Sequence, residues 1–151
     1  MADAPREFRA ETYAIAAQEH ITVAVELHTS QRYALAHYVA GLAVECMLRA
    51  FKSRLDPILD ERHDLDRLAR RGRFFDGASE KRLPVIAARL GEVVTRWDNG
   101  HRYRSETALR KFLTSRRLFA GKGDLLTNSS RRIVNAAVEV VTYGAQLWKN
   151  S

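Results

Sequence analysis

One stretch of the chain, residues 34–51, is apolar on nearly every side of the helix that it predicts. A helix with apolar residues around its whole circumference is surrounded by other helices. Ala40, Gly41 and Ala43 lie in this stretch and are small enough to let neighbouring backbones approach closely. The pattern therefore predicts a buried central helix.

Residues at both ends of this stretch set the limits of the central helix. Ser30 is a suitable N-cap, because its hydroxyl can accept a hydrogen bond from a free backbone N–H of the first turn. The Asp56-Pro57 pair stops the helix near Leu55, since a residue before proline is pushed out of helical geometry. We therefore expect the helix to follow Ser30 and to end near Leu55.

Apolar residues at helical spacing predict three more helices, and capping and helix-breaking residues mark two shorter ones, at 64–71 and 105–119. We expect Asp64, Ser105 and either Asn128 or Ser129 to cap three of them, because short polar side chains are favoured at N-caps. Pro84 is tolerated in the first turn of another. The five helices are expected near residues 6–28, 64–71, 83–98, 105–119 and 129–149.

The fold class follows from these helices and from the length of the chain. No run of residues alternates between apolar and polar for long enough to indicate a sheet, and no internal repeat is visible. A chain of 151 residues is near the usual size of one domain. We predict an all-α fold, an up-and-down bundle of four or five helices, in a single domain over residues 1–151.

The charge of the chain bears on its partners. Arginine greatly outnumbers lysine, the net charge is +7, and the isoelectric point is about 10.0. Guanidinium groups pair bidentately with phosphate, so this composition favours an acidic partner such as RNA. The arginines are spread along the sequence rather than gathered in one block, and a solvated basic surface is the alternative interpretation.

Several features indicate a cytoplasmic protein with no membrane partner. The first residues contain no apolar stretch of the kind found in signal or transit peptides. His37, Glu45 and Arg49 would make the central helix costly to place in a bilayer. Cys46, the single cysteine, lies in the same apolar stretch and is interpreted as a buried hydrophobic residue.

Glu45 is the most informative single residue, because a carboxylate in an apolar helix should not be buried without a partner. Arg49 lies one helical turn later and could supply a positive charge. A basic residue from another helix would hold the helices in register better. We interpret Glu45 as half of a structural ion pair, with catalysis as the alternative.

The histidines give no metal signature. His63 and Asp64 stand where a helix begins, so Asp64 is interpreted as its N-cap and His63 as a residue that packs beside it. The five histidines form neither an HExxH motif nor a Cys/His pattern. We predict no metal site and no cofactor.

A mixed cluster surrounds the predicted helix break at Asn99-Gly100. It combines cations, an imidazole and aromatic rings, which is the mixture that RNA binding uses for phosphate contacts, proton transfer and base stacking. Trp97 continues an apolar stripe and is interpreted as a core residue, and Tyr103 could also pack under the loop. The cluster consists of Arg96, Trp97, His101, Arg102, Tyr103 and Arg104.

The order of three short motifs resembles the HEPN family of small helical proteins. These motifs are residues 38–50 (YVAGLAVECMLRA), residues 62–68 (RHDLDRL), and Trp97 followed by Arg102-Tyr103. In that family an AxxxEcxLKA helix, an HdL motif and a later RY motif recur, and here Arg49 replaces the usual lysine. The resemblance implies a four- or five-helix bundle, frequent homodimers, and roles in toxin-antitoxin, phage-defence or RNA-processing systems.

The resemblance also implies a possible activity. Active family members are metal-independent ribonucleases with an arginine followed, after four to six residues, by a histidine. Arg96 and His101 fit this spacing, and Arg32 and His37 fit it equally well. In this reading His101 is the acid or base, and Arg96 and Arg102 hold phosphate.

Other members of the family carry the HdL and RY motifs without this spacing and are non-catalytic partners of nucleotidyltransferases. In that reading the chain binds RNA, a nucleotide or a partner such as a nucleotidyltransferase or antitoxin, and Arg102 forms a structural ion pair with Glu45. In either reading Arg102, Tyr103 and Arg104 are the expected RNA or nucleotide contacts. A helical scaffold without a nucleic-acid role is the third hypothesis.

Overall fold

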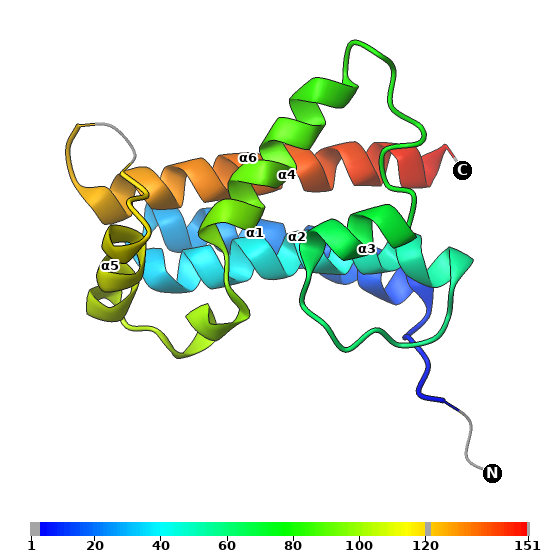
Figure 1. The fold of residues 1–151 in the computed structure, drawn as a ribbon, viewed down its shortest axis with the longest axis horizontal. Helices are drawn as coiled ribbons and strands as arrows, with labels where there is room; N and C mark the ends of the chain where they lie inside the picture. The colour runs from blue at the N-terminus through cyan, green and yellow to red at the C-terminus, as the bar shows by residue number, and fades with distance from the viewer. Residues whose placement is uncertain (1–3, 120–121, 151) are drawn as a thin grey trace.

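The computed structural model describes residues 4–119 and 122–150, and these fold into six α-helices and one short 3-10 helix (Figure 1). Within the described residues the only strand-like pairing is an isolated antiparallel bridge between Arg6 and Ile58. The prediction of an all-helical fold is confirmed. The helices are α1 (Ala10–Thr29), α2 (Tyr33–Leu55), α3 (Leu65–Arg71), α4 (Leu83–Arg96), η1 (Asn99–Tyr103), α5 (Glu106–Ser115) and α6 (Leu125–Lys149).

Helix α2 is the predicted central helix, and it contacts every other helix of the fold. Its residues from Ala43 to Lys52 are all buried, including the charged Glu45, Arg49 and Lys52. By length and composition α2 could cross a membrane, yet 83% of its most apolar window is buried inside the bundle. That burial is what the core helix of a soluble protein shows.

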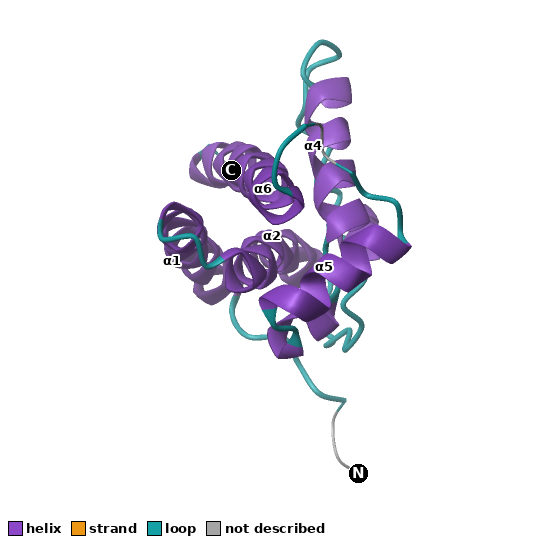
Figure 2. Ribbon diagram, turned by 90° about the vertical axis from the view of Figure 1, so that its left-hand side faces the viewer, coloured by secondary structure: helices purple, strands orange, loops and turns teal. Residues whose placement is uncertain are grey.

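Three long helices form the body of the molecule. Helices α1, α2 and α6 lie side by side, and Figure 2 shows them nearly end-on. Helix α1 runs antiparallel to α2, whereas α2 and α6 run in the same direction (Figure 1). A strict up-and-down order therefore does not extend to α6, because α4, η1 and α5 return the chain to the end at which α2 begins. Helix α4 crosses α6 at a steep angle.

The close approach of α2 to the end of α4 depends on one glycine. A Cβ atom on Gly41 would lie 1.9 Å from Cδ1 of Trp97, so no other residue fits without a shift of the indole. Trp97 is 7% exposed, and its Nε1–H donates a hydrogen bond to the carbonyl oxygen of Tyr38 at 3.2 Å. The prediction that Trp97 is a core residue is confirmed.

The start of α2 differs from the prediction. Ser30 is the C-cap of α1, and α2 begins at Tyr33. The carboxylate of Glu106, from the first turn of α5, accepts hydrogen bonds from the backbone N–H groups of Tyr33 and Ala34, both at 2.9 Å. A negative charge at a helix N-terminus is favourable, so the Glu106 carboxylate caps α2 in place of a local N-cap side chain.

Two other helix starts also differ from the prediction. Helix α1 begins at Ala10 rather than near residue 6, because Arg6 pairs with Ile58 and Glu7 turns into the protein interior. Helix α6 is capped by Asp124, which accepts the N–H of Thr127, and not by Asn128 or Ser129. The Asp64 and Ser105 caps are confirmed, and α3 ends at Arg71 as predicted.

Candidate functional site

The predicted pair Arg96 and His101 is buried, with exposed fractions of 4% and 1%. Arg96 ends α4, and its guanidinium donates to the carboxylate of Glu92 at 3.2 Å and to Oγ of Ser129 at 3.1 Å. Ser129 lies in the second turn of α6 and is fully buried. The predicted arginine therefore holds α4 and α6 together in this structure.

Both ring nitrogens of His101 have partners inside the protein. Nε2 lies 2.7 Å from the carbonyl oxygen of Arg96, to which it can only donate, so Nδ1 accepts from the guanidinium of Arg104 at 2.9 Å. The ring packs edge-on against Phe112. Burial is the main cause that lowers the pKa of His101, with the nearby Arg104 charge adding to it. His101 is thus a neutral, enclosed histidine.

The second pair of the predicted spacing, Arg32 and His37, belongs partly to the same network. His37 is fully buried, its Nδ1 donates to the carbonyl oxygen of Tyr33 at 2.7 Å, and its Nε2 lies 2.8 Å from Oγ of Ser129. Burial lowers the pKa of His37 to about 3, so the ring is neutral and its Nε2 accepts a hydrogen bond from the hydroxyl of Ser129. Ser129 therefore joins His37 to Arg96.

The residues after His101 lie at the surface. Tyr103 is 79% exposed, so it does not pack under the loop, and the Arg102 guanidinium stands 4.7 Å from the centre of its ring. Arg104 is half-buried and also pairs with Asp98 at 3.3 Å. Beside them a hollow of about 290 Å³ is lined by Arg32, Ala34, Leu35, His101, Arg102, Arg104, Ser105 and Glu106.

The predicted ion pair between Glu45 and Arg102 is wrong. One carboxylate oxygen of Glu45 lies 3.2 Å from Nε of Arg49, and the other lies 2.7 Å from Nδ1 of His63. Arg102 lies beside Leu35, ten residues earlier on α2. At about 1.5 Å per residue that is some 15 Å along the helix axis, beyond the reach of the side chain.

The pair of Glu45 and His63 is the acid–base geometry that the sequence did not reveal. Glu45 is buried, whereas the His63 side chain is 43% exposed, just before α3. A carboxylate that holds one ring nitrogen fixes the orientation of the imidazole and leaves the other nitrogen for solvent or a substrate. Of the three histidines discussed here, His63 alone is presented to solvent in this way.

The excess positive charge of the protein lies in one segment, residues 96–132. This segment contains ten arginine and lysine residues and three aspartate and glutamate residues, a surplus of seven that equals the net charge of +7 of the whole chain. It forms the end of α4, η1, α5 and the start of α6, which gather at one end of the bundle (Figure 1). We call residue 32 and residues 96–132 the α5 end.

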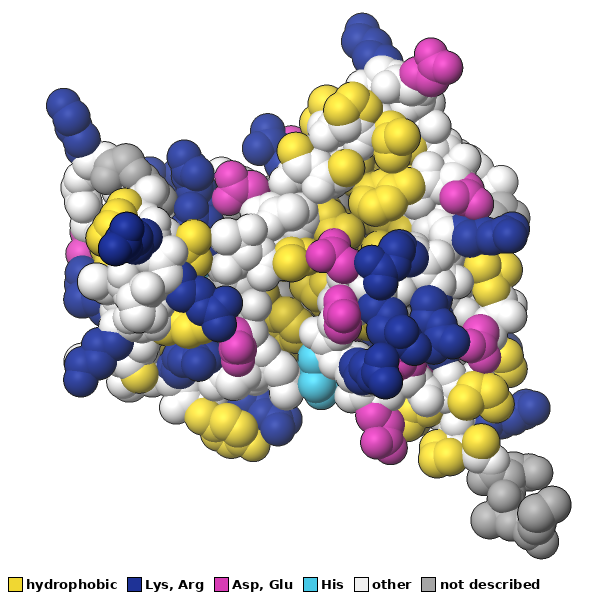
Figure 3. All heavy atoms as spheres, in the orientation of Figure 1, with side chains coloured by type: hydrophobic (Ala, Val, Ile, Leu, Met, Phe, Trp, Pro, Cys, Tyr) yellow, Lys and Arg dark blue, Asp and Glu magenta, His cyan; other side chains and the backbone are white. Residues whose placement is uncertain are grey.

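The cations of the α5 end differ from those near α3. Figure 3 shows dark-blue side chains over both regions, with acidic side chains interspersed around α3. There Arg67 and Arg71 both contact Asp60, at 2.8 Å and 3.4 Å. At the α5 end a larger group of cations is exposed and forms no ion pair with any acidic residue in the described ranges: Arg32, Arg102, Lys111, Arg116, Arg117 and Lys122.

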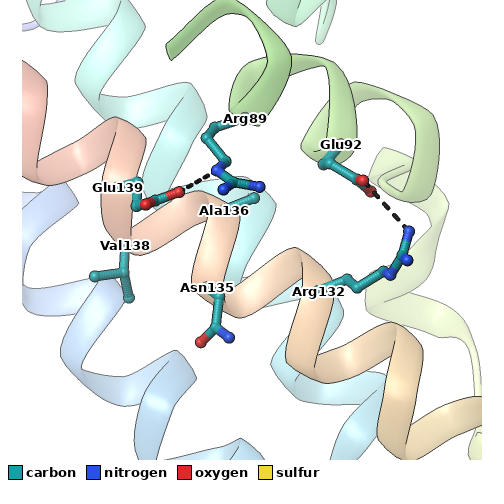
Figure 4. A pocket seen from close by; sticks show the side chains of 7 residues that line it. All are labelled: Arg89, Glu92, Arg132, Asn135, Ala136, Val138 and Glu139. Atoms are coloured by element: carbon teal, nitrogen blue, oxygen red, sulfur yellow. Dashed lines mark hydrogen bonds and ion pairs between the residues drawn. The ribbon is translucent and has the colours of Figure 1, made fainter. Parts of the chain in front are cut away.

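A second hollow, of about 530 Å³, lies between α4 and α6 (Figure 4). Arg89 and Glu92 reach across it from α4, and Glu139 and Arg132 reach across it from α6. Each arginine pairs with the opposing glutamate, and the distance from Arg132 to Glu92 is 3.4 Å. The two arginines and two glutamates have charges that sum to zero, so the lining of the hollow carries no net charge.

Neither a metal site nor a reactive thiol is evident in the described part of the chain. No group of three or more His, Cys, Asp or Glu residues in residues 4–119 and 122–150 has metal-binding geometry. Cys46 is buried, and burial raises its pKa to about 12. A thiol with that pKa is not a nucleophile at neutral pH, so Cys46 is a core residue as predicted.

Comparison of the chain with family models, curated proteins and solved structures finds no match. The site therefore has to be judged on its own geometry. Sequence reasoning missed Ser129, which it treated as a helix cap, and the local surplus of charge, which a running count of charged residues reveals.

Proposed function

We propose that the protein is a HEPN-like helical module that binds single-stranded RNA through the α5 end. The observation that carries the proposal is that all of the excess positive charge falls in residues 96–132, on elements that lie together. Phosphate contacts by arginine and lysine supply most of the affinity of non-specific RNA binding. A surface that concentrates them favours a polyanion as the ligand.

Two exposed aromatic residues indicate which form of RNA would bind. Tyr103 and Phe119 are 79% and 62% exposed, and Arg102 stacks on the Tyr103 ring. Unpaired bases can stack on aromatic side chains and on guanidinium planes, whereas bases inside a duplex cannot. The α5 end therefore fits unpaired nucleotides better than a double helix.

The contacts between the three motifs support the HEPN resemblance. Glu45 of the first motif contacts His63 of the second, and Trp97 packs on Gly41. Residues of motifs that lie far apart in the sequence are thus in contact in the folded protein.

The proposal is tested by binding of a labelled 15-nucleotide RNA to the double variant Arg102→Gln/Lys111→Gln. Both side chains are exposed and form no ion pair with a described acidic residue, so their loss should leave the fold intact. We expect affinity at low salt to fall about tenfold, as two phosphate contacts are removed. Arg70→Gln, which removes one exposed charge from α3, is the control outside the α5 end. Equal losses in both proteins would refute the assignment to the α5 end.

Metal-independent RNA cleavage is a second candidate function, and the Glu45–His63 pair favours it. In such a reaction the free nitrogen of His63 takes the proton of a ribose 2′-hydroxyl, whose oxygen attacks the adjacent phosphorus. The 5′-oxygen leaves and takes a proton from water, which gives a 2′,3′-cyclic phosphate and a 5′-hydroxyl. The enclosed His101 is less suited to this role.

Cleavage of RNA in EDTA by the wild-type protein, with loss of activity in His63→Gln and retention in His101→Gln, would establish this second function. Glu45→Gln is expected to reduce the rate through misorientation of His63. If the wild-type protein binds RNA and leaves it intact over hours, the binding proposal stands and the cleavage proposal fails.

A further inference from the structure

A set of donors surrounds the carboxylate of Glu7, in the segment that precedes α1, and we call this set the Glu7 pocket. One carboxylate oxygen lies 3.2 Å from Nη1 of Arg49, 3.2 Å from Nζ of Lys52, and 3.4 Å from the backbone nitrogen of Asp60. The other accepts the hydroxyl proton of Tyr13 at 2.5 Å. Four donors from α1, α2 and the loop before α3 therefore converge on a single carboxylate.

The donors of this pocket are themselves held in place. The Lys52 side chain has no exposed surface, and it also donates to the carbonyl oxygen of Ile58. Arg49 is fixed by Glu45 and by the carbonyl oxygen of Asp60 at 2.7 Å. Glu45 offsets the charge of Arg49, and Lys52 needs a negative charge of its own, because an uncompensated buried charge is strongly destabilising. The pocket is therefore shaped and charged for an anion.

The Glu7 carboxylate belongs to a segment whose other side chains are exposed. Residues 4–9 lie outside α1, and only Glu7 among them has a side chain without exposed surface. Two backbone hydrogen bonds hold the segment. The N–H of Glu7 donates to the carbonyl oxygen of Pro57 at 2.8 Å, and the N–H of Leu59 donates to the carbonyl oxygen of Pro5 at 2.9 Å. Phe8 is 70% exposed and touches only the edge of Tyr13 in the aromatic contacts of the structure.

We propose that this pocket is a binding site for a carboxylate group and that Glu7 is its built-in occupant, which an external carboxylate can replace. The pocket cannot stand empty, because Lys52 would then be buried without a counter-charge and Arg49 would keep Glu45 as its single acidic partner. Release of the segment and entry of another carboxylate are therefore a single exchange. The exchange uncovers the loop at residues 57–59 without opening the apolar core.

The first experiment removes the occupant. In Glu7→Ala the missing atoms are a methylene and a carboxylate, which acetate replaces atom for atom. We expect the variant to melt several degrees below the wild-type protein in sodium chloride, and to recover most of that loss in sodium acetate of equal ionic strength. Glu11→Ala removes an exposed carboxylate of α1 and should show no acetate effect.

The identity of the site is tested by the double variant Glu7→Ala/Lys52→Met, in which acetate should restore nothing. A blocked glutamate serves as a second probe: recovery at lower concentrations than acetate needs would indicate an acidic side chain of another chain as the natural occupant, and recovery no better than with acetate would indicate a free carboxylate. No recovery with either probe, or recovery with inorganic phosphate alone, would overturn the proposal.

The wild-type protein supplies a test that does not depend on a variant that folds. Hydrogen exchange at the backbone N–H groups of Glu7 and Leu59 should become faster in acetate than in chloride at equal ionic strength, because acetate displaces the segment. Unchanged exchange up to high acetate concentrations would mean that Glu7 is a permanent structural anchor, and the proposal would then be wrong.

Discussion

Among the residues that the structure describes, three non-glycine residues adopt a left-handed backbone conformation that glycine would tolerate better. Gln31, Arg73 and Arg117 have φ angles of 62°, 52° and 55°. Each follows the end of a helix and donates its N–H to a carbonyl three residues earlier. A side chain in this region costs roughly 1 kcal/mol relative to glycine. Two of the three positions carry arginine, and only Arg117 lies at the α5 end.

Substitution of Arg73 and of Arg117 can separate an effect on stability from an effect on RNA binding, because both residues have the same backbone strain. Arg117→Gly and Arg73→Gly should each raise the free energy of unfolding by up to about 1 kcal/mol, because glycine removes the same backbone strain. Only Arg117→Gly should also weaken RNA binding, since Arg73 lies beyond α3. Urea unfolding and RNA titration of both variants provide the measurement. Weaker binding in both variants would contradict the assignment to the α5 end.

The buried histidines make stability depend on pH. The folded protein keeps His37 neutral down to about pH 3, because burial lowers its pKa, whereas the unfolded chain binds this proton near pH 6.5. Between these values the unfolded state binds more protons, so stability decreases as the pH falls from about 6.5.

We expect a loss of up to about 1.4 kcal/mol per pH unit from His37 alone, with a further contribution from His101, whose pKa is also lowered. Urea unfolding at pH 7.5, 6.5 and 5.5 measures it, and His37→Gln should show a shallower dependence. Equal stability at all three pH values would mean that the ring is not buried in a neutral state.

At the scale of single residues, the sequence showed that Glu45 needed a buried basic partner but not which one. Arg49 was visible as a neighbour on the same helix, and it is one of the two partners. His63 was not, because the loop before α3 folds back on α2 through contacts that no periodicity records. Long-range pairs of this kind depend on tertiary packing, and Arg102 was the wrong choice for that reason.

At the scale of elements, the contact between α2 and Trp97 gives a sharp test with two glycines. Gly41→Ala should lower the free energy of unfolding by about 1–3 kcal/mol, because its Cβ would overlap the indole. Gly91→Ala, in the exposed part of α4, meets no atom within 4 Å and should raise it by up to about 1 kcal/mol. Thermal unfolding of both variants measures the difference. If both alanines stabilise the protein, α2 and Trp97 do not pack as described.

The helices themselves were predictable, and their starts were less so. Apolar spacing placed α1, α2, α4 and α6, because burial of an apolar stripe requires it. The caps of α3 and α5 followed from local polar residues, Asp64 and Ser105. The start of α2 did not, since its cap is Glu106 from another helix. A local rule cannot predict a cap that a distant segment supplies.

At the scale of the whole molecule, the fold gathers the net positive charge at one end of the bundle, although arginines are spread along the sequence. The arginines occur along the whole chain, but outside residues 96–132 acidic residues offset them. The fold then collects that segment around α5 (Figure 1). The surplus was present in the sequence, whereas its gathering on one end, with Tyr103 exposed beside it, required the structure.

The most direct test of the central claim is the salt dependence of binding to a 15-nucleotide single-stranded RNA between 50 mM and 200 mM salt. A polyanion held by about four or more cations gives a log–log slope of about −3 or steeper, at about −0.7 for each phosphate contact. Arg102→Gln/Lys111→Gln should make the slope shallower by about 1.4, and Arg70→Gln should leave it unchanged. A wild-type slope near zero, or the same slope in all three proteins, would contradict RNA binding by the α5 end.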